Sequence, residues 1–175
     1  MRLLTLLLIL TVLTVNSYAE TFGKTTSGQN IESNQPKHVT TRFYMPQRGN
    51  VHSMAILFGN NITDNPLVFG AVYSDLSSKT GNTPGKLLGY TQIGFGLYSG
   101  WNTFNMASTL TLSPGYYWLD IVIYKGIIDL AYDEIGNTVL SLNNTNSLTP
   151  PMTIFQSGVF LQREYSVYAN YTPLP

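Results

Sequence analysis

Apolar and polar residues alternate along much of this chain, in short segments separated by Gly, Pro, Asn, Asp and Ser. A period of two is typical of β-strands that bury one face, and a helical period of 3.6 residues is almost absent. Turn residues that recur between short strands are typical of a β-sandwich or barrel. The pattern predicts strands at residues 38–45, 50–58, 67–74, 86–94, 100–106, 108–112, 116–124, 126–132 and 165–171, with shorter ones at 137–142 and 152–156.

The phase of the alternation predicts which side chains point inward. Within residues 165–171, the odd-numbered positions carry Tyr, Val, Ala and Tyr and share one face. Within residues 119–123, the odd-numbered positions are all apolar, and the opposite face carries Asp120 and Val122. Because this second face is mixed rather than polar, we expect that strand to be central and partly covered on both sides.

Two polar stretches stand apart from the predicted strands. Residues 74–85, SDLSSKTGNTPG, are rich in turn residues and long for a hairpin, so we expect a functional loop there. Residues 20–36 have few apolar anchors and are predicted to form an edge strand or a mobile polar arm. No internal repeat or domain boundary divides the rest, which predicts one antiparallel β-sandwich domain over residues 37–175.

The N-terminus has the pattern of a secretory signal peptide. Arg2 precedes an apolar run at residues 3–15, and small residues follow at Ser17 and Ala19. The run is shorter than the roughly 20 apolar residues of a transmembrane helix. We therefore expect cleavage of residues 1–19, giving a protein that is secreted, extracellular or at the cell surface, with no stable membrane insertion.

The composition narrows the classes of partner. Charged residues make up 10% of the chain, its formal net charge is zero, and it contains no cysteine. Globular domains usually have about a quarter of charged residues. Since no basic residues cluster, nucleic acid is not expected as a partner. Without cysteine, the fold must be held by its core rather than by disulfides. Neutral polar surfaces of this kind are common on proteins that are glycosylated, assembled or bound to carbohydrate.

Four short sequences, taken in order, carry a resemblance to a known group of proteins. They are AVYSD at 71–75, PGKLL at 84–88, GWN at 100–102 and GYYWL at 115–119. In this order they are similar to exported bacterial and archaeal surface modules. The resemblance implies a jelly-roll-like β-sandwich of the kind found in cell-surface and carbohydrate-associated proteins, generally without assigned catalysis. It transfers no catalytic residue to this chain.

Aromatic residues in the second half of the chain offer both core and binding candidates. Tyr117 shares a strand face with apolar residues and is predicted to lie in the core. Trp118 is also predicted to be buried, with a ligand platform as the alternative. Trp101 begins a strand beside Tyr98 and Asn102, where a side chain can sit at the end of a sheet. We take Trp101, Tyr98 and Asn102 as candidate ligand-binding residues, although burial of Trp101 is favoured.

Three Asn-x-Ser/Thr triplets are candidate glycosylation sites, at Asn61, Asn143 and Asn170. The first two lie in Asn-rich, turn-like segments, where a bulky glycan fits a solvated loop. Asn170 lies within a predicted strand, on its outward face. Turn formation by Asn is the alternative explanation for each triplet.

Acidic residues offer oxygen ligands for a structural calcium ion, which takes six to eight of them. Asp129, Asp133 and Glu134 lie close together in the sequence, and Asp75 lies in the predicted loop. No calcium-binding repeat is present, so solvated carboxylates and turn caps are the favoured interpretation. We expect no cofactor.

The sequence offers little for catalysis. His38 and His52 are the only histidines, and both fall inside predicted strands. No nucleophile-elbow pattern accompanies them, and few acids are available for a glycosidase pair. We therefore expect a protein that is not an enzyme.

The leading hypothesis is a non-catalytic, exported binding or adhesion module that acts through contacts with glycans or surface proteins. The alternative is a structural subunit of an extracellular filament or sheath. In that case residues 20–36 would add a strand to the sheet of the next subunit. A polysaccharide-active enzyme is the least favoured hypothesis.

Overall fold

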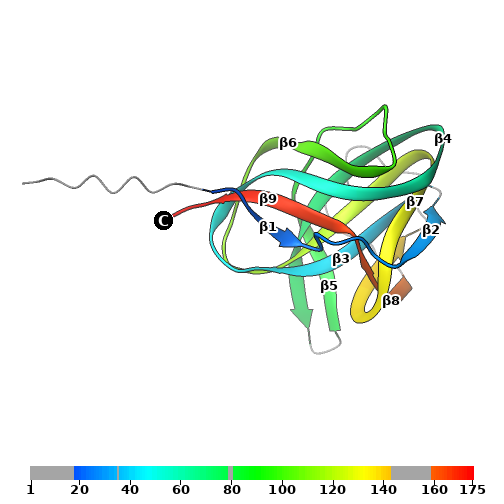
Figure 1. Ribbon diagram of the computed structural model, residues 1–175. Helices are drawn as coiled ribbons and strands as arrows, with labels where there is room; N and C mark the ends of the chain where they lie inside the picture. Colours follow the sequence, from blue (N-terminus) through cyan, green and yellow to red (C-terminus); the bar gives the residue numbers. More distant parts are fainter. Residues whose placement is uncertain (1–17, 35, 79–80, 143–158) are drawn as a thin grey trace, which may run out of the picture.

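The computed structural model describes residues 18–34, 36–78, 81–142 and 159–175, which form an antiparallel β-sandwich (Figure 1). This confirms the predicted all-β fold. The strands are β1 (Glu20–Gly23), β2 (Asn30–Asn34), β3 (Lys37–Met45), β4 (Gly49–Ser78), β5 (Gly81–Tyr90), β6 (Gly100–Leu112), β7 (Gly115–Leu142), β8 (Val159–Tyr165) and β9 (Val167–Pro173). In these four ranges no helix is long and apolar enough to cross a membrane.

Two very long strands connect the layers of the sandwich. β4 has 30 residues and β7 has 28. The first part of β4 lies between β6 and β9, and β9 also pairs with β1. The later part of β4 lies between β5 and β7, and β3 pairs with β7 on its other side. Because β4 and β7 bend from one layer into the other, the hydrogen bonding is continuous through all nine strands.

The bend of β4 lies where the sequence carries turn signals. Asp64 and Asn65 have positive φ values of 62° and 49°, and the ladder with β7 shifts register between Thr63 and Leu67. Across the ladder, Gly126 has φ of 81°, and a Cβ there would lie 2.6 Å from Pro66 Cα. The two strands therefore bend together at a bulge. The separately predicted strands 50–58 and 67–74 are thus parts of one strand.

Other strands that were predicted separately are also parts of longer strands. Predicted strands 100–106 and 108–112 form β6, and 116–124, 126–132 and 137–142 all belong to β7.

The predicted loop at 74–85 is wrong. β4 and β5 remain paired from Asp75 opposite Pro84 to Ser78 opposite Gly81. Backbone pairing in a two-stranded ribbon does not require apolar side chains, so the polar sequence was misleading. The proposed strand at 152–156, and residues 1–17 of the proposed leader, lie outside the described residues.

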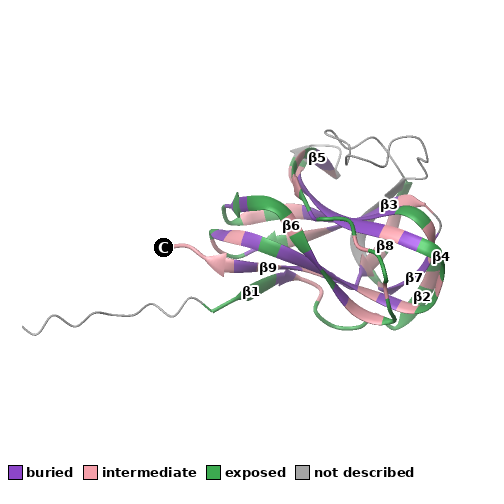
Figure 2. Ribbon diagram, turned by 90° about the horizontal axis from the view of Figure 1, so that it is seen from above, coloured by how far each residue is buried: buried purple, intermediate pink, exposed green. Residues whose placement is uncertain are grey.

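The main core draws on strands of both layers. The inward face of β9 is fully buried, as the alternation predicted, from Tyr165 at the end of β8 to Tyr171. A second buried cluster lies on the opposite face of β4 and β7 and contains Phe69, Tyr73 and Trp118. The strand at 119–123 is therefore covered on both faces, as predicted (Figure 2). Trp118 is fully buried, and Tyr117 packs partly buried against the main core.

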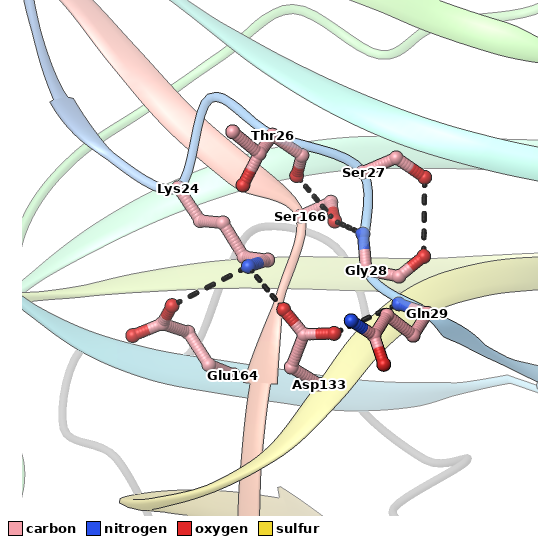
Figure 3. A network of polar contacts seen from close by, with 8 residues as sticks. All are labelled: Lys24, Thr26, Ser27, Gly28, Gln29, Asp133, Glu164 and Ser166. Atoms are coloured by element: carbon pink, nitrogen blue, oxygen red, sulfur yellow. Dashed lines mark hydrogen bonds and ion pairs between the residues drawn. The ribbon is translucent and has the colours of Figure 1, made fainter.

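Residues 20–34 are bound within their own chain. β1 pairs with β9, β2 pairs with β7, and Phe22 is buried in the main core. Between β1 and β2, Lys24 forms an ion pair with Asp133, and its Nζ lies 3.7 Å from Glu164 Oε1 (Figure 3). The hydroxyl of Ser166 donates to the carbonyl of Thr26 at 3.0 Å and accepts from the N–H of Gly28 at 2.9 Å. This stretch is an integral part of the sandwich.

Candidate functional site

A cavity of about 500 Å³ lies beside the bend of β4. Its walls are Ile62 and residues 64–67 from the bend, and residues 95–97 from the connection between β5 and β6. We call it the Phe95 pocket, because Phe95 lines it and is 80% exposed. Its volume lies within the range of about 300–1,000 Å³ that is usual for small-ligand sites.

Backbone contacts fix Phe95 beside the bend. The N–H of Gly94 donates to the carbonyl of Val68 at 2.7 Å, and Val68 donates back at 3.4 Å. A Cβ on Gly94 would lie 2.0 Å from the ring of Phe104, so only glycine permits this close approach. Two residues after Phe95, Leu97 packs against the main core. The exposed ring is thus held between two anchored positions.

A second set of hydrogen bonds holds the C-terminal end of the connection between β5 and β6. The side chain of Asn102 accepts from the N–H of Tyr98 at 3.2 Å and donates to the carbonyls of Tyr98 and Gly100 at 2.7 and 3.0 Å. The hydroxyl of Ser99 donates to Asn60 Oδ1 at 2.8 Å, which ties the connection to the bend of β4. Function is often carried by loops that a rigid scaffold positions in this way.

The three predicted ligand-binding residues have different surroundings. Asn102 is buried, and its side chain hydrogen-bonds to the backbone of the connection between β5 and β6. It therefore supports that connection. Tyr98 is exposed, and its hydroxyl donates to the carbonyl of Trp101 at 3.0 Å. Trp101 is half-buried, with its ring 4.9 Å from that of Tyr168. None of the three lines the Phe95 pocket.

The pocket combines three chemical groups that a ligand with apolar and polar parts could contact. Phe95 offers an aromatic face, Asp64 a carboxylate and Asn65 an amide. Among the residues that the structure describes, neither Asp64 nor Asn65 makes a side-chain hydrogen bond or ion pair. An aromatic ring can stack on the apolar face of a pyranose, while a carboxylate and an amide accept from and donate to hydroxyl groups.

Most other acids are engaged in the fold. Asp75 accepts two bonds from Arg42, at 2.8 and 2.7 Å. The ammonium of Lys24 and the N–H of Gln29 hold the pKa of Asp133 below its usual value. For Glu32, burial raises the pKa, but hydrogen bonds from Tyr165 and Arg163 outweigh it, so the pKa is lowered.

The calcium candidates do not converge on one point. Asp75 and Asp133 have the partners just described, and Asp129 accepts from the hydroxyl of Ser33 and the N–H of Asn61. Glu134 lines a separate shallow hollow with Arg163. Within the described ranges, no three His, Cys, Asp or Glu side chains are grouped so that they could hold a metal ion.

The two histidines lie away from the Phe95 pocket. His38 is buried in β3, with Nδ1 2.7 Å from Asp120 Oδ2. Burial lowers the pKa of His38, but the attraction of Asp120 and its hydrogen bond outweigh this, so the pKa is raised. His52 is exposed, and its Nε2 lies 2.8 Å from the hydroxyl of Thr172.

The glycosylation candidates differ in access. Asn61 is exposed within the bent part of β4 and donates to Ser33 Oγ at 3.1 Å. Asn170 is half-buried in β9 and donates to Ser53 Oγ at 2.9 Å. Asn143 lies outside the described residues. Of the two that can be placed, Asn61 offers the more open amide.

Sequence reasoning missed the residues that form the pocket. The signals were present as the turn sequence Asp64-Asn65-Pro66 and as Phe95 between Gly94 and Gly96. An aromatic residue between two glycines, just after a strand, indicates a ring on an exposed turn. Only the fold brings the two signals together, because they lie about 30 residues apart.

No family model and no curated protein matches this chain. One solved structure that is similar in fold is the crystal structure of the cysteine protease and lectin-like domains of Cwp84, a surface layer associated protein of Clostridium difficile. The similarity has a TM-score of 0.56 at 12% sequence identity and covers 89% of this chain. It covers only 36% of the other chain, so it is a likeness of fold to a part of that structure.

Proposed function

We propose that this chain is an exported, non-catalytic module that binds glycans in the Phe95 pocket. The observation that carries the proposal is that Phe95, which is 80% exposed, lines one cavity together with Asp64 and Asn65. Ligand sites typically combine apolar walls with a few polar groups that fix orientation. The anchored backbone on both sides of Phe95 reduces the entropy that binding would cost.

Two further observations support an extracellular binding role. The similar solved structure comes from a surface layer associated protein and includes a lectin-like domain. It also includes a cysteine protease domain, whereas this chain contains no cysteine, which favours binding over that chemistry. The neutral, weakly charged composition and the leader-like N-terminus agree with export.

The filament alternative depended mainly on residues 20–36 being free to leave their own chain. Strand addition to a neighbour requires a free donor strand, and residues 20–36 were the candidate. In the structure β1 and β2 pair with β9 and β7 of the same chain. We therefore favour contact through the surface over exchange of this segment.

The test is a glycan array followed by titration with the best ligand. Phe95→Ala should weaken binding about tenfold, because a stacked aromatic anchor usually contributes more than 1 kcal/mol. Asp64→Asn should weaken it less. Ile93→Ala is the matched control, because Ile93 is exposed on the same connection but does not line the pocket. Equal affinity of Phe95→Ala and the wild type, or no glycan bound, would rule the proposal out.

A further inference from the structure

A second exposed aromatic group lies far from the Phe95 pocket. Tyr44 of β3 and Tyr116 of β7 are cross-strand partners, and their ring centroids are 5.0 Å apart at an angle of 59°. They are 52% and 48% exposed. Among the ring pairs formed by the described residues, this is the one in which both rings are largely open to solvent. We call it the Tyr44–Tyr116 platform.

Contacts beside the platform, on the same face of the sheet, hold it in place. The guanidinium of Arg42 lies 3.7 Å from the centroid of the Tyr116 ring. Arg42 is fixed in turn by two hydrogen bonds to Asp75, at 2.8 and 2.7 Å. The indole N–H of Trp118, which is fully buried, donates to Asp75 at 2.7 Å. An aromatic surface that is already ordered loses little side-chain entropy when a ligand binds.

The charged pair beside the platform is internally neutral. Arg42 and Asp75 form a two-bond ion pair, and the exposed parts of the two tyrosines offer aromatic surface and hydroxyl groups. The hydrogen bond to Asp75 is the main reason that the pKa of Arg42 is raised, so the pair stays ionised. A neutral ligand with apolar ring faces and hydroxyl groups matches this surface, whereas a charged peptide or a uronate does not.

We infer that the Tyr44–Tyr116 platform is a second binding site, specific for the pyranose rings of uncharged polysaccharides. It is separate from the Phe95 pocket. Leu67 lines that pocket and Asp75 binds Arg42 beside the platform, and the two residues are eight positions apart in β4, with seven residues between them. At about 3.3 Å per residue, the two sites are roughly 25 Å apart.

Two sites on one rigid domain have a consequence for long ligands. A polymer that reaches both sites binds the second one intramolecularly, so its overall affinity exceeds that of a short fragment. A monosaccharide can occupy only one site at a time. The inference therefore predicts that affinity rises with chain length, and that this gain requires both sites.

The experiment compares disaccharides, which are too short to reach both sites, with long chains of neutral β-glucan, mannan and galactan by isothermal titration, with polygalacturonate as the charged comparison. Tyr44→Ala/Tyr116→Ala should remove one class of site and most of the gain with chain length, about tenfold or more. Tyr44→Phe/Tyr116→Phe keeps both rings and should lose less. Tyr124→Ala, another exposed tyrosine of β7, is the matched control.

The possible results separate this inference from the proposed function. If Phe95→Ala removes all binding and the Tyr44/Tyr116 double variant behaves as the wild type, the platform is not a site, while the pocket stands. If the double variant alone loses binding, the platform stands and the pocket is excluded. Tighter binding of polygalacturonate than of every neutral chain, or capture of protein but no polysaccharide, overturns the inference. Thermal melting of each variant verifies that it is folded.

Discussion

Individual buried polar residues outside the two hydrophobic clusters are held in specific pairs. His38 and Asp120 are both fully buried, and Asp120 also accepts from the hydroxyl of Thr40 at 2.8 Å. Taking charges out of water is costly, and the cost is met only when partners are well placed. Because attraction to Asp120 outweighs burial, the folded pKa of His38 lies above its value in the unfolded chain.

This pair predicts how stability depends on pH. A histidine whose pKa is raised on folding contributes stability fully below its unfolded pKa of about 6.5, and the contribution is lost as pH rises through the folded pKa. Urea unfolding should therefore give a free energy of unfolding that falls as pH rises from about 6. Asp120→Asn removes the charge that raises the pKa of His38, while burial still lowers it, so the slope should become shallower or reverse. An unchanged slope in Asp120→Asn would exclude His38 as its source.

Single-residue predictions succeeded where alternation alone decides the outcome. Burial of Trp118 and of the inward face of β9 follows from a period of two between strongly β-prone residues. The pairing of His38 with Asp120 could not be predicted, because it depends on the register that sets Thr40 opposite Asp120, 80 positions away. The Phe95 pocket depends on a similar long-range contact between Gly94 and Val68.

At the scale of strands, the sequence located the β segments but not their continuity. The turn residues near positions 64 and 126 are those that would also end a hairpin. Whether they end a strand or bend it depends on the partner across the ladder, which local sequence does not specify. Here β4 and β7 bend together, and Gly126 permits the contact with Pro66.

Two glycines with similar backbones test the importance of this bend. Gly126 and Gly96 have φ of 81° and 65°, so alanine at either costs about 1–2 kcal/mol in a left-handed conformation. A Cβ at Gly126 would also lie 2.6 Å from Pro66 Cα, whereas nothing lies within 4 Å at Gly96. We expect Gly126→Ala to lower the free energy of unfolding by about 1–3 kcal/mol more than Gly96→Ala. Chemical denaturation of both variants measures the difference, and equal losses would refute a crowded bend.

For the molecule as a whole, the N-terminal segment closes the sandwich. β1 covers the edge of β9 from Tyr171 to Tyr168, and Phe22 packs against Tyr117 and Tyr171 with ring centroids 6.3 and 6.1 Å apart. Because this segment has few apolar residues, its sequence left both an edge strand and a mobile arm open. Phe22, Lys24 and backbone pairing all stabilise the segment in place. Their contribution could not be predicted without knowing which strand lies beside the segment.

Deletion of residues 20–28 therefore has a specific expected result. It removes the large buried side chain of Phe22, which on its own should cost about 3–5 kcal/mol, and it leaves the edge of β9 unpaired. The truncated chain should melt at a lower temperature and self-associate in size-exclusion chromatography. Phe22→Ala, which keeps the β1–β9 ladder, should melt lower but remain free of such association.

A synthetic peptide of residues 20–28 separates edge closure from a general loss of packing. The truncated chain should bind the peptide and regain stability, because the peptide restores both the ladder and the aromatic contact. The full chain should not bind it, because its own β1 already occupies β9. If the full chain captures the peptide, β1 exchanges readily and strand addition between subunits becomes the better account of this segment. If the truncated chain is monomeric with unchanged stability, closure by β1 contributes nothing to the fold.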